Sequence, residues 1–141
     1  MLYLDTCVLL AVLLPEVYSE RATRFLQDAT DPLAISPWTG TEVHSALGLK
    51  VRTGCLTRDQ ADRVLQTFEQ ELAPALVMLE LQPVDFRHAD ACLRGWTTNL
   101  RAADALHLAV AAGRGACLCS LDQPLVQAAL QLGLDARLIS D

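Results

Sequence analysis

The stretch Leu2-Tyr3-Leu4-Asp5-Thr6 opens the chain with a short apolar segment that ends at an acid. An apolar run with helical character follows it as far as Leu14 and is stopped by Pro15. A short apolar strand that passes directly into a helix is typical of the first unit of an α/β fold. The pattern therefore predicts that Asp5 lies at the carboxyl end of the first strand.

Short apolar strands and helices continue to alternate along the rest of the chain. Further strands are predicted over residues 33–36, 77–81 and 116–120, with a last candidate at 136–139. Helices are predicted over residues 19–28, 38–52, 57–72, 86–96, 105–112 and 124–132. Such alternation produces a mainly parallel sheet covered on both faces. We expect an α/β protein of three layers, α/β/α, with four to five central strands and a single domain over residues 1–141.

Composition and charge limit the possible functions. The net charge is −6, which argues against a general nucleic-acid binder with a basic face. A carboxylate metal site would account for part of this charge, and Lys50 is the only lysine in a basic set made otherwise of arginine, which suits phosphate. The 52% hydrophobic content is explained equally by a thick core or by an interface.

The cysteines and the apolar runs indicate the compartment. The chain has five cysteines without a CxxC pair, which predicts reduced, buried thiols in a cytoplasmic protein. No signal peptide is visible, and the longest apolar run is too short to span a bilayer, so we expect no membrane role.

Four acids are predicted to meet at one edge of the sheet. Asp5 and Asp122 follow the first and fourth strands, Glu42 lies early in the helix after the second strand, and Asp104 begins a helix. Ligands bind at this carboxyl edge in parallel sheets. Clustered carboxylates repel one another unless a cation lies among them, and Mg²⁺ and Mn²⁺ prefer oxygen ligands. The chemistry that fits is phosphodiester hydrolysis.

Each acid also has a simpler interpretation. Asp5 and Asp104 are both placed to cap the helices that follow them. Glu42 is bordered by polar residues and fits a surface charge. The prediction of a site depends on the joint placement of all four acids.

Four motifs carry a resemblance to a known family. They are Tyr3–Leu9, Thr39–Val43, Cys119–Asp122 and, most specifically, Leu100-Arg101-Ala102-Ala103-Asp104-Ala105-Leu106-His107-Leu108-Ala109. Over nearly its whole length the chain resembles the PIN-domain family, and within it the VapC-type toxins of toxin–antitoxin pairs. The resemblance implies a PIN-like fold, a Mg²⁺- or Mn²⁺-dependent endoribonuclease that cuts RNA, a homodimer and inhibition by a cognate antitoxin.

The resemblance also implies roles for particular residues. Asp5, Glu42, Asp104 and Asp122 would be the catalytic metal ligands, and the hydroxyls of Thr6 and Ser120 would support them. Arg101 is a possible contact to RNA, although pairing with a neighbouring acid is an equal alternative.

The chain departs from the family pattern at two places. Cys7 stands where members often have Ser or Asn, which leaves open whether a polar contact near the site is kept. Gln123-Pro124 follows Asp122 where many members have a further acid, so we expect one tightly held metal.

Three aromatic and imidazole side chains have competing interpretations. His107, one helical turn after Asp104, is either a metal ligand or, as we expect, a histidine packed and hydrogen-bonded inside its helix. Trp38 and Trp96 could stack a base, but packing in the core or at an interface is the expectation for both.

Two other functions fit parts of the sequence. A catalytically silent module could bind a partner protein through the predicted helical hairpin, Trp38 to Leu72. A phosphotransfer enzyme could use Asp5 as a nucleophile, but Cys7 stands where such enzymes carry a second acid.

Overall fold

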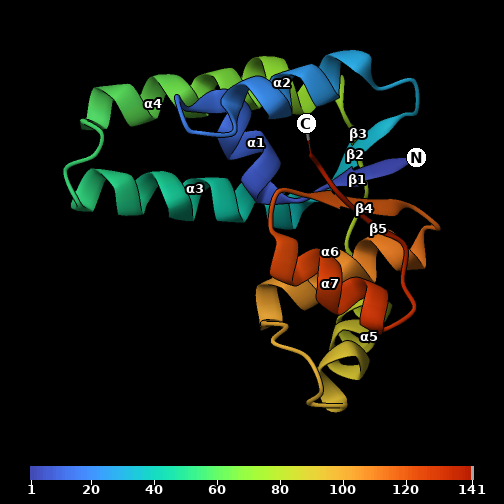
Figure 1. Cartoon of the computed structure of the whole chain (residues 1–141). Coiled ribbons are helices and arrows are strands. Elements are labelled where there is room, and N and C mark those ends of the chain that lie inside the picture. The colour runs from blue at the N-terminus through green and yellow to red at the C-terminus, as the bar shows by residue number, and fades with distance from the viewer. Residues whose placement is uncertain (141) are drawn as a thin grey trace.

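The computed structural model describes residues 1–140. Its five short parallel strands form one sheet in the order β3-β2-β1-β4-β5 (Figure 1). The strands are β1 (Leu2–Leu4), β2 (Leu33–Ile35), β3 (Val77–Met78), β4 (Cys117–Ser120) and β5 (Ala136–Leu138). Since β1 lies between β2 and β4, the chain extends the sheet first on one side of β1 and then on the other. Such a reversal places a ligand crevice beyond the carboxyl end of β1.

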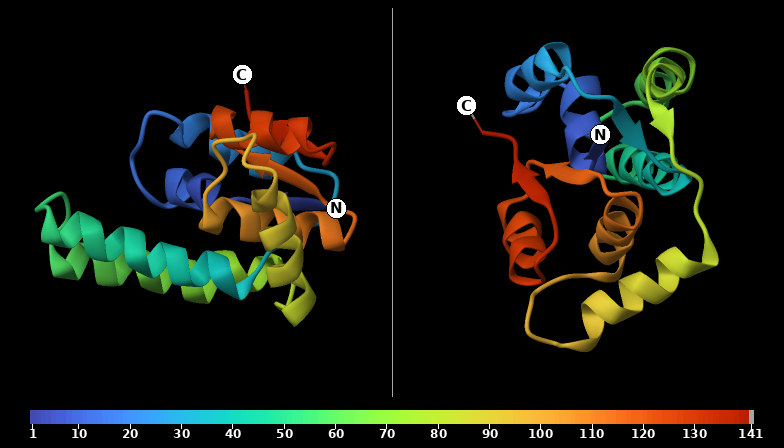
Figure 2. Two further views of the ribbon diagram at one scale, coloured as in Figure 1. Left: turned by 90° about the horizontal axis from the view of Figure 1, so that it is seen from below. Right: turned by 90° about the vertical axis from the view of Figure 1, so that its right-hand side faces the viewer.

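Helices cover both faces of the sheet. One layer contains α1 (Thr6–Leu13), α2 (Ser19–Asp28), α3 (Pro37–Arg52) and α4 (Arg58–Thr67), and the other contains α5 (Pro83–Arg94), α6 (Ala102–Gly113) and α7 (Gln123–Gln131) (Figure 2). The predicted three-layer α/β/α fold is confirmed. Within residues 1–140, none of the helices has the length and apolar character that crossing a bilayer requires.

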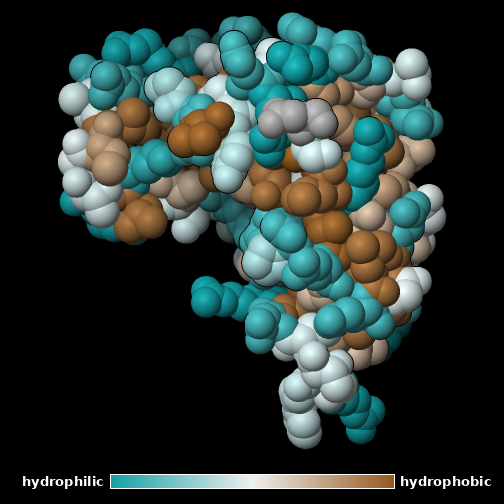
Figure 3. Space-filling model, in the orientation of Figure 1, coloured by the Kyte–Doolittle hydropathy of each residue, from teal (hydrophilic) through white to brown (hydrophobic). Residues whose placement is uncertain are grey.

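The strands divide the core into two halves because neighbouring residues face opposite sides of a sheet. Tyr3 packs with α5, α6 and α7, whereas Leu4 packs with α1 and α3, and both side chains are fully buried. Apolar side chains also gather on the surface over α7 and β5 (Figure 3), where Leu130 is 57% exposed. The high hydrophobic content therefore supplies two dense core layers and some exposed apolar surface.

The predicted hairpin of α3 and α4 is present and projects from the sheet (Figure 1). Gly54 lies in the connection with a φ of 75°, a conformation that favours glycine. A capping box begins α4: the Gln60 N–H donates to the Thr57 hydroxyl at 3.2 Å, and the Thr57 N–H donates to the Gln60 side chain at 2.8 Å. The predicted helix reaches Leu72, but its last turn, Phe68–Leu72, is a π-helix.

The boundaries around α5 differ most from the prediction. Strand β3 ends at Met78 and not near residue 81, because it is an exposed edge strand that pairs only with β2. Helix α5 begins at Pro83, earlier than predicted, since proline suits the first turn and Asp85 accepts the Gln82 N–H at 2.7 Å. Helix α6 likewise begins at Ala102.

A buried ion pair joins α5 to the end of α6. Asp85 is fully buried and receives both Nη1 and Nη2 of Arg114, the latter at 2.9 Å. Arg114 Nη2 also donates to the Glu80 carbonyl at 2.7 Å. Burial raises the pKa of Asp85, but the hydrogen bonds from Arg114 and the Gln82 N–H outweigh it and hold the pKa below its ordinary value. The pair thus fastens α5 against α6, the helix that carries Asp104.

Asp85→Asn should lower the free energy of unfolding at pH 7 by about 2 kcal/mol. This loss is smaller than for a fully buried ion pair, because the Arg114 that loses its partner is partly exposed. The folded state lowers the pKa of Asp85. Its contribution to the free energy of unfolding is therefore full above the unfolded pKa of about 4, and it is lost as the pH falls through the folded pKa. Denaturant unfolding at pH 7 and pH 3 should show a deficit that shrinks in acid. Asp90→Asn, on the exposed face of α5, is the control. A deficit equal at both pH values would contradict this role.

Candidate active site

Asp5 is fixed where β1 ends beside β4. Its N–H donates to the Cys119 carbonyl at 3.0 Å, and the residue is 7% exposed. Its Oδ2 accepts the Ser120 hydroxyl at 2.6 Å and the Cys7 thiol at 3.0 Å. Asp5 does occupy the N-cap position of α1, but its side chain makes no capping hydrogen bond to that helix. Its carboxylate is instead held at the sheet edge.

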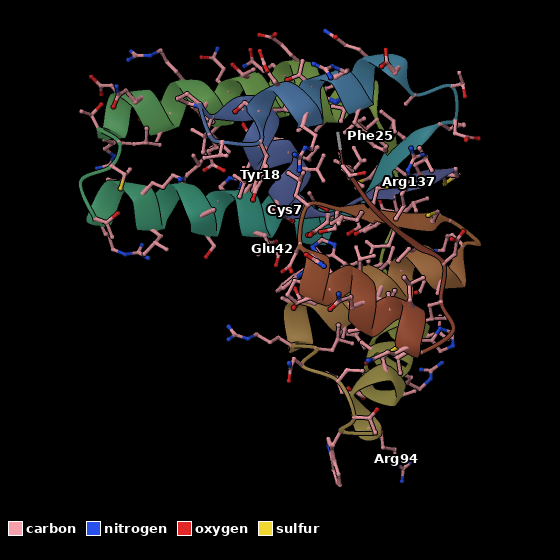
Figure 4. All side chains as sticks on the ribbon, viewed as in Figure 1. Cys7, Tyr18, Phe25, Glu42, Arg94 and Arg137 are labelled. Atoms are coloured by element: carbon pink, nitrogen blue, oxygen red, sulfur yellow. The ribbon has the colours of Figure 1, made fainter. Side chains whose placement is uncertain are left out.

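Cys7 keeps a polar contact at the position where the family often has Ser or Asn. Besides donating to Asp5, its Sγ accepts the Leu121 N–H at 3.4 Å and lies 3.3 Å from Ser120 Oγ. Burial, more than the charge of Asp5, raises the thiol's pKa, so the thiol keeps its proton and acts as a donor. Figure 4 shows Cys7 and Glu42 where α1 and α3 meet the layer of α6 and α7.

One carboxylate oxygen of Glu42, in the second turn of α3, accepts hydrogen bonds from two side chains. Its Oε2 accepts the Thr6 hydroxyl and lies 2.5 Å from His107 Nε2. Burial pushes the pKa of Glu42 upward, but the hydrogen bond and charge of His107 and the Thr6 hydroxyl outweigh it and lower the pKa. Glu42 is therefore an ionised carboxylate fixed toward α6, and not a free surface charge.

Asp5, Glu42 and His107 form a group that could hold a metal ion. One potential ligand atom from each lies within 4.8 Å of the others, and His107 Nε2 is 3.7 Å from Asp5 Oδ1. Asp104 and Asp122 are not members of this closely spaced group. The structure thus joins two of the four predicted acids directly and adds a histidine.

Asp104 and Asp122, together with Arg101, line a cavity of about 480 Å³ whose lining includes none of Asp5, Glu42 and His107. Asp122 caps α7 by accepting the Leu125 N–H at 3.3 Å. Asp104 lies inside the first turn of α6, whose N-cap is Arg101, so the simpler interpretation of Asp104 as the cap of a following helix is wrong. Burial first, and then the negative charges of Asp5 and Asp122, raise the pKa of Asp104. Asp104 therefore lies close enough to Asp5 and Asp122 for their negative charges to act on its carboxyl group.

Ser120 connects the two parts of the site. Its hydroxyl donates to Asp5 Oδ2, while its Oγ accepts the Asp122 N–H at 2.9 Å. The same side chain is fully buried at the end of β4. It therefore fixes Asp5 relative to the turn that carries Asp122.

The donor set fits a hard divalent cation. In the described part of the chain, the hydrogen bonds to Asp5 and Glu42 go to Oδ2 and Oε2, which leaves Oδ1 and Oε1 as possible ligands. Carboxylate oxygens are the ligands that Mg²⁺ and Mn²⁺ prefer. The raised pKa of Asp104 indicates negative charge that such a cation would offset.

The remaining predicted side chains have mixed outcomes. His107 is 1% exposed, as expected, but its ring nitrogens bond to Tyr3 of β1 and Glu42 of α3 and not to groups inside α6. Trp38 packs against the core, but Trp96 is 89% exposed, so packing in the core is wrong for it. Sequence reasoning missed the donor role of Cys7 and the contact of Tyr3 with His107. Only the helical spacing of His107 from Asp104 gave any signal of these contacts.

Comparison with known proteins identifies the class of protein. The family model of the PIN domain matches residues 2–129, and the chain belongs to this family. Comparison with curated protein sequences finds no significant match.

Several solved structures share the fold. FitAcB from Neisseria gonorrhoeae superimposes with a TM-score of 0.73 at 19% identity, over 96% of each chain. VapC20 of Mycobacterium tuberculosis, described as a sarcin-ricin loop cleaving toxin, gives 0.69 at 14% identity, over 91% of this chain and 95% of that one. VapBC2 from Rickettsia felis, bound to a promoter DNA fragment, gives 0.70 at 14% identity, over 99% and 100%. At these identities the likeness shows the fold.

Asp104→Asn should stabilise the metal-free protein at pH 7, because it removes a carboxylate that burial and two like charges disfavour. The folded state raises the pKa of Asp104, so its destabilising effect is absent below the unfolded pKa and is complete above the folded pKa. In EDTA at pH 7 the Tm should rise by roughly 2–5 °C, and the gain should vanish near pH 3. Asp62→Asn, exposed on α4, is the control. An unchanged or lower Tm at pH 7 would show that Asp104 does not feel the other acids.

Proposed function

We propose that this PIN domain is a metal-dependent endoribonuclease that hydrolyses RNA phosphodiester bonds, and that it is the toxin of a toxin–antitoxin pair. The observation that carries the proposal is the meeting of Asp5 and Glu42 beyond β1, with Asp104 near enough for the charge of Asp5 to raise the pKa of Asp104. A structural cap or a surface charge does not require this arrangement, whereas a cation between carboxylates does.

Asp5, Glu42, Asp104 and Asp122 would hold one tightly bound Mg²⁺ or Mn²⁺. When bound, such a cation lowers the pKa of a coordinated water and stabilises negative charge on a phosphoryl group. Thr6 fixes Glu42 and Ser120 fixes Asp5 through their hydroxyls, so both carboxylates are oriented before a cation arrives. This preorganisation is what a hydrolytic metal centre needs.

Arg101 is the cation best placed to hold the substrate's backbone. It is exposed and lines the cavity that also contains Asp104 and Asp122. A guanidinium at the rim of an acidic site can bind a phosphate flanking the scissile bond through two parallel hydrogen bonds. It would offset part of the repulsion between RNA and the acids.

The similar structures support the biological role and the partners. One of them is described as a toxin that cleaves the sarcin-ricin loop, and others are the FitAB and VapBC2 complexes, each bound to DNA. By analogy we propose that residues 1–141 act as a single domain in the cytoplasm, as a homodimer restrained by a cognate antitoxin. A small gene beside this one that encodes an inhibitor would support the pairing.

Purified protein with Mg²⁺ or Mn²⁺ should cut a structured RNA, and Asp5→Asn should reduce the rate by at least about 100-fold, since loss of a mere supporting contact already costs up to that much. Asp59→Asn, an exposed acid on α4, should cleave like the natural protein. Thermal unfolding would verify that both variants are folded.

Equal cleavage by Asp5→Asn and the natural protein would contradict the proposal. Absence of both cleavage and Mn²⁺ binding in the natural protein would favour a silent module that binds a partner through the α3–α4 hairpin. Calorimetry with Mn²⁺ separates these outcomes without knowledge of the RNA target.

A further inference from the structure

A buried chain of hydrogen bonds leads from the start of α3 to Glu42. Ser36 Oγ lies 2.7 Å from Tyr3 Oη, which lies 2.8 Å from His107 Nδ1. On the other side of the ring, His107 Nε2 lies 2.5 Å from Glu42 Oε2. Ser36, Tyr3 and His107 are each at most 1% exposed. These residues come from β1, α6 and the segment between β2 and α3, so the fold alone brings them together.

We infer that His107 is a positioning residue: its Nε2–H holds Glu42 for the cation, and Tyr3 and Ser36 fix the imidazole in that orientation. The inference rests on the proposed metal-dependent function and concerns the same site. It assigns His107 a role different from that of a metal ligand.

The direction of these hydrogen bonds follows from the Glu42 carboxylate at the end of the chain of bonds. An ionised carboxylate oxygen can only accept, so at 2.5 Å a proton must lie on His107 Nε2. In a neutral imidazole the other nitrogen is then an acceptor, which receives the Tyr3 hydroxyl proton. Tyr3 Oη, 2.8 Å from Nδ1, is the hydroxyl placed to donate to it. Tyr3 Oη can then accept the hydroxyl proton of Ser36.

The geometry of the rings keeps this arrangement in place. The centroids of the Tyr3 and His107 rings are 5.6 Å apart and their planes are inclined by 54°, an attractive tilted contact. Tyr3 is two residues before Asp5, and residues two apart along an extended chain point to the same side of the sheet. His107 is one helical turn after Asp104. Tyr3 therefore lies in the strand that leads directly to Asp5, and His107 lies in the same helix as Asp104.

The consequence is an all-oxygen environment for the cation. Glu42 Oε2 is occupied by Thr6 and His107, and His107 Nε2 is occupied by its own proton, so Glu42 Oε1 is the oxygen left for a cation. If His107 were instead a ligand, its imidazole would favour a softer metal such as Zn²⁺. The arrangement thus selects Mg²⁺ or Mn²⁺.

Nuclear magnetic resonance of ¹⁵N-labelled protein tests the assignment directly. In long-range ¹H–¹⁵N spectra of the natural protein without metal, we expect His107 to carry its proton on Nε2, and we expect the proton to stay there after Mg²⁺ is added. An unprotonated Nε2, or loss of its proton on addition of Mg²⁺, would overturn the inference. This measurement uses the natural protein only, so it needs neither RNA cleavage nor a correctly folded variant.

Calorimetric affinity for Mg²⁺ tests the positioning role. His107→Ala should weaken binding by about 10- to 100-fold and Tyr3→Phe by about 10-fold, as expected for contacts that orient a ligand. His107→Gln retains an N–H donor and should recover most of the loss. His44→Ala and Tyr18→Phe, both exposed, are the matched controls and should bind like the natural protein.

The outcomes distinguish the two proposals. If the natural protein binds no Mg²⁺ or Mn²⁺, the proposed metal-dependent function fails. If it binds and His107→Ala binds equally well, only the positioning role fails. If His107→Gln loses as much affinity as His107→Ala, the histidine acts as a ligand and the inference is overturned.

Discussion

The close approach of the Asp5 and Glu42 carboxylates, with ligand atoms within 4.8 Å of each other, is the constraint around which the site is organised. Carboxylates held this close together need compensation from hydrogen-bond donors or from a cation. The compensation in the chain itself comes from donors on separate elements: Ser120 and Cys7 for Asp5, and Thr6 and His107 for Glu42. Each donor set occupies one oxygen, so the other oxygen of each carboxylate can serve a cation.

The strand order is what makes these contacts possible. Asp5 meets Ser120 because β1 pairs with β4, and Tyr3 meets Ser36 because β2 pairs with β1 on the other side. The ion pair of Asp85 and Arg114 fastens α5 against α6, and α6 carries both Asp104 and His107. A reversed position for either neighbour of β1 would separate the acids although every local element stayed intact.

Much of this architecture could be predicted because it depends on local patterns. Alternating apolar strands and helices predicted the parallel sheet, and the strand ends placed Asp5 and Asp122 at one edge. The start of α3 and the Leu100–Ala109 motif likewise indicated Glu42 and Asp104. The predicted roles of the four acids remain proposals, whereas their positions at the carboxyl edge of the sheet are part of the fold.

The parts that could not be predicted depend on distant contacts or on marginal local energies. Tyr3 and His107 are 104 positions apart, and no periodicity pairs a tyrosine with a particular histidine. Cys7 could replace a more polar residue because its thiol finds a carboxylate acceptor, which the sequence cannot display. The short β3 and the π turn after α4 reflect edge pairing and helix packing more than residue preference.

A crystal soaked in Mn²⁺ and measured near the manganese absorption edge would reveal whether the acids at the end of β1 bind a hard cation. We expect one strong anomalous peak within bonding distance of Asp5 and Glu42 oxygens, on the side of Asp104, with His107 Nε2 outside the coordination shell. No peak at this position, or a peak coordinated by His107 in place of Glu42, would contradict it.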